Sequence, residues 1–196
     1  MVKKMQMLSK IKNEFARALR NFHYERTPTG MLFPKQGICI GGVFSFRVDD
    51  GPKDSANNTL ALQCLDAMLT SFFTGVVPPT AFYIAPFINN VAPTSALTAA
   101  TFTATQGEYT GYTAAARLQW VPDGASSGQT VGNTIAPAQF TIGASAATVA
   151  GAGLMTASAK SATTGTLIAA ALFATPNALN ANSKLSIEYS LSAIAS

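Results

Sequence analysis

Charged residues are scarce in this sequence, and most of them lie near its start. Of the 196 residues, 13 are Lys or Arg and nine are Asp or Glu, so 11% of the chain is charged. An ordinary soluble domain is about a quarter charged. Residues 1–60 hold ten of the basic and five of the acidic residues, which leaves three and four for residues 61–196. A surface with so little charge is either covered by partner proteins or kept soluble by Ser, Thr, Asn and Gln.

Cysteine and histidine are also rare, with two cysteines, Cys39 and Cys64, and one histidine, His23. Two cysteines are too few for a disulfide framework. They allow one bridge, but we expect two buried thiols that act as small apolar side chains, as in a protein made in a reducing cytosol. The three residues lack the spacing of zinc ligands, and His23 adjoins a flexible junction that is ill suited to a Ser–His–Asp triad. The sequence therefore predicts no metal site and no cofactor.

Two long uncharged runs lack the character of membrane helices. Residues 67–88 contain Pro78, Pro79 and Pro86, which interrupt a helix, and residues 166–174 are too few to span a bilayer. The lysines near the start are not followed by an unbroken apolar stretch, so we expect no secretory signal. A glycine-rich phosphate loop ending in Lys-Ser or Lys-Thr is absent as well.

The acidic residues give little sign of catalysis. Asp49, Asp50 and Asp54 fall in a turn-rich segment, and a calcium loop needs a longer ligand series with a closing Glu. We interpret them as a solvated turn. Glu108 and Asp123 form an acid pair only if the fold brings them together. We therefore expect a binding or structural protein and not an enzyme.

Alternation of apolar and polar residues indicates a mainly β fold. In the last predicted strand, Leu185, Ile187, Tyr189 and Leu191 share one face, because successive side chains of a strand point to opposite sides. The region before it is rich in Ala, Thr, Ser and Gly, with short apolar segments between turn residues. We predict about eight or nine strands, mostly antiparallel, in a β-sandwich or jelly-roll-like domain.

This β-rich domain, residues 31–196, is expected to contain one packed helix at about residues 57–74. Asn57 or Asn58 can cap the start of the helix, and Gly75 can end it. The helix has a broad apolar face and a single charged residue. A helix with this composition has to lie against a sheet or another subunit.

Several shorter segments complete the domain. Residues 31–33 and 38–40 are predicted strands, and residues 95–100 form at most a helical turn. Residues 166–173 fit either a short helix or a buried strand, and we prefer the strand because the neighbouring segments are short and separated by turn residues. The glycines of residues 149–156 are expected to allow close approach of another part of the chain.

Residues 1–30 form a separate basic arm. Apolar residues recur at three- and four-residue steps between residues 5 and 22, which predicts an amphipathic helix. Such a helix docks on its own domain, grips a neighbouring subunit, or lies on nucleic acid or an anionic membrane. The basic residues form no patch with interleaved aromatics, so we expect neither a nucleic acid nor a membrane as partner. The residues expected to bind a partner protein are Lys4, Leu8, Ile11, Lys12, Phe15, Arg17, Leu19, Arg20 and Phe22.

A series of short segments between residues 30 and 193 keeps a recognisable order and spacing. The segments are Gly30–Pro34, Gly41-Gly42 with Phe44, Asn58–Leu60, Leu65–Leu69 with Phe73, Phe82–Ala85, Glu108–Tyr112, Arg117–Trp120, Gln139–Ile142, Thr163–Leu167 and Leu185–Tyr189. In these segments the chain resembles a family of small structural proteins of tailed bacteriophage virions. The resemblance implies a virion component, and the family has no known active site to transfer.

Within that family, we expect a capsid decoration (cement) protein. It would be made in the host cytoplasm and would bind the outer capsid shell as a homo-oligomer, preferably a trimer. Its arm would clamp neighbouring subunits of the major capsid protein. The alternatives are a tail, collar or fibre-anchoring protein and a glycan-binding module. In the glycan-binding module Trp120, Tyr109 and Tyr112 would form a stacking surface, but we interpret these three residues as part of the core.

Overall fold

The computed structural model describes residues 24–26, 32–34 and 38–195. The described residues divide into two compact units, of which one contains the first two segments and the other comprises Ile40–Ile194.

The smaller unit contains a short antiparallel pair of strands. Strand β1 is Tyr24–Arg26 and strand β2 is Leu32–Pro34, and Glu25 lies opposite Phe33. The strand predicted at residues 31–33 is confirmed. Strand β1 was not predicted, because three residues are too few to show an alternation.

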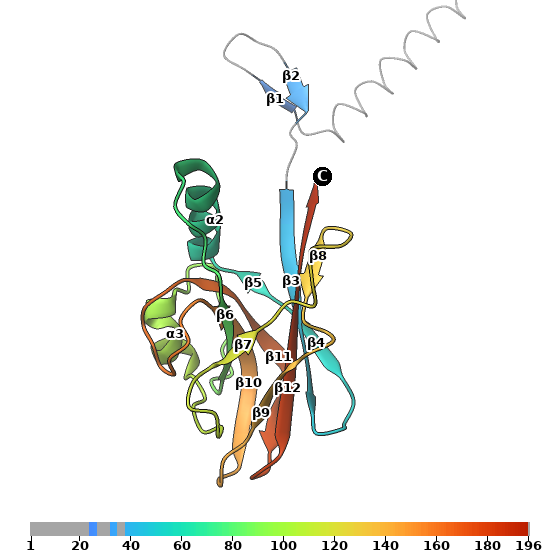
Figure 1. Cartoon of the computed structure of the whole chain (residues 1–196), viewed down its shortest axis with the longest axis vertical. Helices are drawn as coiled ribbons and strands as arrows, with labels where there is room; N and C mark the ends of the chain where they lie inside the picture. Colours follow the sequence, from blue (N-terminus) through green and yellow to red (C-terminus); the bar gives the residue numbers. More distant parts are fainter. Residues whose placement is uncertain (1–23, 27–31, 35–37, 196) are drawn as a thin grey trace, which may run out of the picture. The chain divides into compact units, whose positions relative to one another are not determined.

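The larger unit is built from two antiparallel sheets (Figure 1). The first has the order β5-β11-β10-β6-β7, and its strands are Thr59–Leu60, Leu167–Leu179, Ala147–Met155, Phe82–Phe87 and Leu118–Trp120. The second has the order β4-β3-β12-β8, with β9 also paired to β12, and its strands are Asp54–Asn57, Ile38–Val48, Lys184–Ala195, Thr130–Gly132 and Ala138–Thr141. This arrangement confirms the predicted mainly β antiparallel sandwich, and β11 includes the segment for which a strand was preferred over a helix.

Strand β12 follows the alternation predicted for it. Leu185, Ile187 and Tyr189 are fully buried in the core, and Leu191 is half-buried. One edge of β12 pairs with β3, while β8 and β9 pair with successive parts of the strand. The strand is therefore an interior one, and most of its backbone polar groups are used within the sheet.

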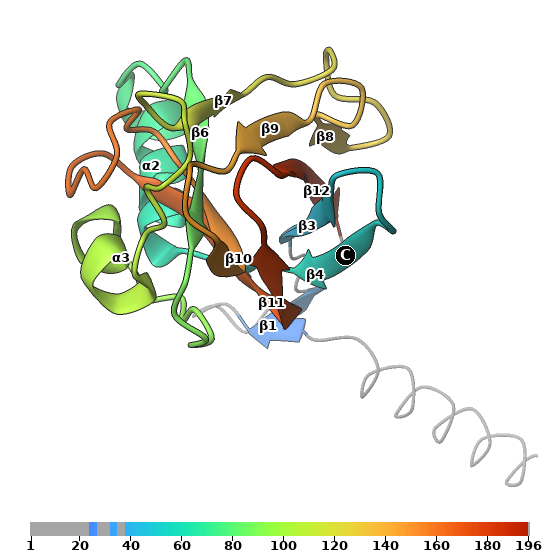
Figure 2. The ribbon, with the colours of Figure 1, turned by 90° about the horizontal axis from the view of Figure 1, so that it is seen from below.

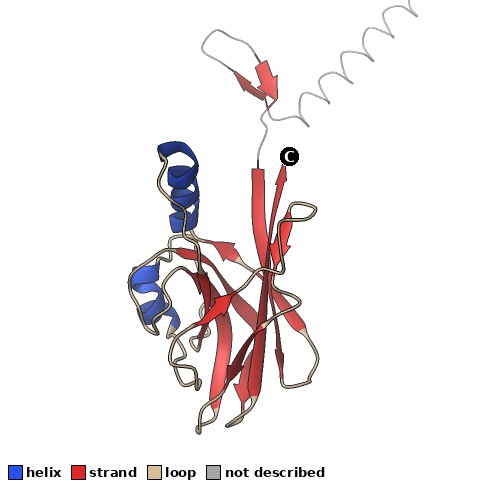
Figure 3. Cartoon of the chain, viewed as in Figure 1, coloured by secondary structure: helices blue, strands red, loops and turns tan. Residues whose placement is uncertain are grey.

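Two helices, α2 (Leu62–Thr74) and α3 (Ala99–Gln106), lie outside the layers of strands (Figure 3). Helix α2 begins later than predicted, because the residues before it form β4 and β5. The predicted cap is wrong as well, since the Asn58 side chain accepts a hydrogen bond from the backbone N–H of Gly42. The end of α2 is as predicted: Gly75 has a φ of 73°, in the left-handed region that favours glycine.

Helix α3 covers the outer face of the first sheet, beside β10 (Figure 2), where only a helical turn was predicted. Thr98 and Thr101 form a reciprocal capping box at its start. Phe102 of the helix is fully buried, and its ring packs edge-on against Phe87 at 5.9 Å between centroids. A Cβ atom at Gly153 would lie 2.8 Å from the Phe102 ring, and one at Gly151 would lie closer still to the backbone carbonyl oxygen of Ala171. The close approach predicted for this glycine region is confirmed by the backbone contact at Gly151.

Tyr189 connects several parts of the sandwich by hydrogen bonds. Its backbone N–H donates to the Asn133 side chain at 2.7 Å, and its carbonyl accepts from the indole N–H of Trp120 at 3.0 Å. Its hydroxyl accepts from the Asn58 amide at 3.1 Å, and Asn58 also bonds in both directions with the backbone of Gly42. Burial raises the pKa of the Tyr189 hydroxyl, which keeps this group neutral in the core.

The chain offers a matched pair of glycine substitutions that tests this arrangement. A Cβ atom at Gly42 would lie 2.5 Å from the Tyr189 hydroxyl and 2.7 Å from the Ser190 carbonyl, whereas a Cβ atom at Gly41 would meet nothing within 4 Å. We expect Gly42→Ala to lower the free energy of unfolding by about 2 kcal/mol. Gly41→Ala should change it by less than about 0.5 kcal/mol in urea titrations. Equal stability of the two variants would contradict the packing described for Tyr189.

Candidate functional site

An apolar surface is exposed on α2 and on the loop that follows it. Only Cys64 of the helix is fully buried. Phe72, Phe73 and Val77 expose 79%, 81% and 80% of their surface. We use the name α2 surface for the six large apolar side chains that are more than half exposed here: Leu62, Leu69, Phe72, Phe73, Val76 and Val77. The helix contacts β11, so the prediction that it lies against a sheet is confirmed for one side only.

A small apolar groove lies beside the α2 surface. It has a volume of about 230 Å³ and is lined by Cys64, Ala67, Met68, Ser71, Phe72, Pro78, Pro79, Phe82, Ile168 and Leu191. Sites for drug-sized ligands are larger, at about 300–1,000 Å³. Burial raises the pKa of the Cys64 thiol, which keeps it protonated and unreactive. The groove therefore suits an apolar side chain better than a cofactor or a substrate.

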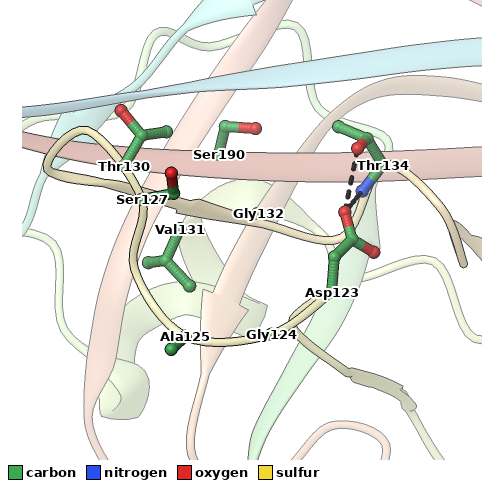
Figure 4. A pocket seen from close by; sticks show the side chains of 9 residues that line it. All are labelled: Asp123, Gly124, Ala125, Ser127, Thr130, Val131, Gly132, Thr134 and Ser190. Atoms are coloured by element: carbon green, nitrogen blue, oxygen red, sulfur yellow. Dashed lines mark hydrogen bonds between the residues drawn. The ribbon is translucent and has the colours of Figure 1, made fainter.

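A second hollow is polar and lies at the loop between β7 and β8 (Figure 4). It has a volume of about 250 Å³, and mostly small side chains line it: Asp123, Gly124, Ala125, Ser127, Thr130, Val131, Gly132, Thr134 and Ser190. Asp123 accepts hydrogen bonds from the N–H and hydroxyl of Thr134 and from the N–H of Ile135, at 2.6, 2.8 and 3.0 Å. Desolvation acts to raise the pKa of the Asp123 carboxyl, but these hydrogen bonds outweigh it and lower that pKa. Both carboxylate oxygens hold the loop together, so we assign Asp123 a structural role.

Glu108 and Arg117 form a buried ion pair. Two nitrogens of the guanidinium donate to the two carboxylate oxygens at 2.8 and 2.6 Å, and both side chains are fully buried. The Arg117 side chain also donates to the carbonyl of Ala157 at 2.9 Å, and the backbone N–H of Ser161 donates to Glu108 at 3.0 Å. The pair therefore fixes the loop around residues 157–161 on the segment that carries Glu108.

The two carboxylates considered as an acid pair, Glu108 and Asp123, bind different partners. Glu108 is buried in its pair with Arg117, and the exposed Asp123 uses both carboxylate oxygens to hold its own loop. Asp49, Asp50 and Asp54 are exposed, and the first two lie in a turn as predicted, whereas Asp54 begins strand β4. The buried pair of Glu108 and Arg117 was not predicted. The one signal for it was the presence of two opposite charges, nine residues apart, in a region with very few charges.

The aromatic residues considered for glycan stacking lie mostly in the core. Trp120 and Tyr112 expose only 7% and 3% of their surface and belong to the core, as we interpreted them, and Tyr109 packs partly buried beside Tyr112. They therefore provide no open stacking surface for a glycan.

Cys64 is buried, but the prediction that Cys39 is buried is wrong, because Cys39 is exposed. Its segment borders the division between the two units and not the centre of the sandwich.

The residues predicted to bind a partner through the arm lie outside the described residues, as does His23. The arm residues are Lys4, Leu8, Ile11, Lys12, Phe15, Arg17, Leu19, Arg20 and Phe22. Their binding role stays a prediction. The structure adds the α2 surface. The sequence predicted a packed helix with a broad apolar face, but not that much of this face is exposed.

Over residues 24–26, 32–34 and 38–195, no three His, Cys, Asp or Glu side chains come together in a way that would hold a metal ion. In the same part of the chain, no helix has the length and apolarity needed to cross a membrane. Comparison of the sequence with protein-family models and with curated proteins found no match.

Replacing one partner of the buried ion pair should destabilise the sandwich strongly. In Arg117→Met the Glu108 carboxylate loses its buried counter-charge, and we expect a loss of about 3–5 kcal/mol in the free energy of unfolding. The pair of Lys53 and Glu188 is the control, because the Lys53 side chain is half exposed to water. Lys53→Met should cost less than about 1 kcal/mol. Comparable losses for the two variants in urea titrations would contradict the role given to Arg117.

Proposed function

We propose that this chain is a capsid decoration (cement) protein of a tailed bacteriophage. It binds the outer shell as a homo-oligomer, preferably a trimer, and clamps neighbouring subunits of the major capsid protein. The observation that carries the proposal is the α2 surface, a broad exposed apolar area on a domain with very few charges. Exposed apolar area of this extent is typical of surfaces that meet another protein.

The scarcity of charge supports an assembly role. Seven charged residues lie in residues 61–196, and Glu108 and Arg117 neutralise each other in the interior. Five charges remain for the rest of this stretch. A surface of this kind meets protein neighbours without removing many charges from water, which is a costly step in forming an interface.

The basic arm supplies the contact with the capsid in this proposal. Its apolar residues would bury area on the major capsid protein at about 25 cal/mol per Å², and its Lys and Arg residues would meet acidic patches. A decoration protein that spans neighbouring capsid subunits in this way resists the outward pressure of packaged DNA. The proposal assigns no catalytic residue and no cofactor.

A tail, collar or fibre-anchoring protein is the alternative, because the resemblance is to virion structural proteins in general. The two functions differ in where the chain binds. A decoration protein binds capsids that have no tail, whereas a tail or collar protein requires the tail or the vertex that carries it.

The test is co-sedimentation of the purified chain with expanded, tail-free capsids of the same virus. We expect the natural chain to bind, and we expect Phe15→Asp combined with Leu19→Asp to weaken binding by at least about tenfold, because two apolar anchors are lost. Ile135→Asp changes a side chain that is 83% exposed elsewhere in the domain and should bind as the natural chain does.

Two results would count against the proposal. If the natural chain fails to bind tail-free capsids but binds complete particles, the tail or collar function replaces it. Full binding by the Phe15 and Leu19 double variant would remove the arm from the account.

A further inference from the structure

The exposed side of α2 has the residue spacing of a helix–helix contact. Leu62, Leu65, Leu69 and Phe72 recur at steps of three, four and three residues, which is the a/d pattern of a coiled coil over the length of the helix. Phe73 widens the same side. A helix in this pattern offers a partner helix a continuous row of apolar side chains. The sandwich covers the opposite side of α2, through Cys64. It leaves Leu62, Leu69 and Phe72 more than half exposed, while Leu65 is half-buried.

The exposed area is enough for the central part of a stable contact between copies. Phe72 and Phe73 each expose about four-fifths of their surface, and Val77 does the same. With typical side-chain areas, the α2 surface as a whole presents on the order of 500 Å² of apolar area. A standard interface buries about 800 Å² on each partner, of which the central part is the most apolar. The α2 surface is thus large enough to form the core of such an interface.

The charge of this region favours a second copy over the other candidate partners. Asp66 is the one charged residue in α2, and residues 75–81 contain none. The basic arm, residues 1–30, contains seven Lys and Arg residues, and on this surface it would find one acid. Two α2 surfaces in contact have to remove only Asp66 of each copy from water, and Asp66 lies to one side of the row.

The groove beside the row gives the contact a concave apolar part. It lies between α2 and the segment of Pro78 and Pro79, with Met68 and Phe82 in its lining. Phe72 belongs both to this lining and to the row, and it is 79% exposed. An apolar side chain from a partner α2 that enters this groove would be held by a concave apolar wall, which is the typical environment of an interface anchor.

We propose that α2 is the self-association surface of this protein: it packs against α2 of a second copy through Leu62, Leu65, Leu69, Phe72 and Phe73. This contact holds together the homo-oligomer of the proposed function. For its biological setting the inference rests on that function, whereas its test does not involve capsids.

The test is sedimentation velocity of the full chain at a series of concentrations. The natural chain should sediment as an oligomer, and Leu69→Glu combined with Phe73→Glu should raise the dissociation constant at least about 100-fold, because two apolar side chains are lost from the contact. Both residues are more than half exposed, at 58% and 81%, so the double variant should keep the circular dichroism spectrum of the natural chain and a cooperative unfolding transition, although loss of the oligomer lowers its melting temperature. If its circular dichroism spectrum differs, Phe73→Glu alone serves as the variant.

Ile135→Glu is the matched control, since Ile135 is 83% exposed and lies in the loop after β8. It should leave the oligomer unchanged. A monomeric natural chain, or an oligomer that persists in both α2 variants, would overturn the inference. Loss of the oligomer in Phe15→Asp combined with Leu19→Asp, with α2 unchanged, would identify the arm as the occupant and overturn it as well. Because no capsid is present, failure here is separate from failure to bind the shell.

Discussion

The sandwich depends on the hydrogen bonds and packing of Tyr189 in its interior strand β12. The residue uses its N–H, its carbonyl and its hydroxyl to bond Asn133, Trp120 and Asn58, which come from three distant parts of the sequence. Its ring lies 4.5 Å from that of Phe44, between centroids. A strand in the middle of a sheet is thereby fixed in register, because a shift by one residue would break all three bonds and turn Tyr189 to the other face. The absence of a side chain at Gly42 is a condition of this arrangement.

The few charges of the domain serve mainly to hold its own loops. Glu108 and Arg117 form the buried pair, Asp123 bonds the loop at Thr134 and Ile135, and Lys160 donates to two backbone carbonyls, those of Thr110 and Tyr112. Glu188 pairs with Lys53. Because these charged groups are paired or hydrogen-bonded within the domain, fewer unpaired charges remain on the outer surface than the composition suggests. This internal use of charge and the apolar α2 surface together favour contacts between protein subunits over catalysis.

The sequence predicted the parts of the fold that depend on local pattern. The alternation of β12, the strand character of β11 and the end of α2 at Gly75 are all properties of neighbouring residues, and the structure has them. The start of α2 could not be predicted, because the Asn58 side chain, a candidate cap, instead donates a hydrogen bond to Tyr189, which lies 131 residues away. The pairing of Glu108 with Arg117 likewise depends on the fold, and a pattern of neighbouring residues does not show it.

The extent of the α2 surface could not be predicted from the sequence either, because it also depends on the fold. An apolar helix predicts burial, but the side on which its own domain covers it is set by the sheets beneath it. The structure assigns Cys64 to the covered side and Phe72 and Phe73 to the open side. In the proposed oligomer, a second copy of the chain covers this open face.

The most direct measurement of the central claim is a cryo-electron microscopy reconstruction of the intact particle that locates and counts this chain. The account predicts on the order of hundreds of copies on the outer shell, arranged as symmetric oligomers with the α2 helices of neighbouring copies in contact. About a dozen copies or fewer at a single vertex, or a shell without density for this chain, would contradict it.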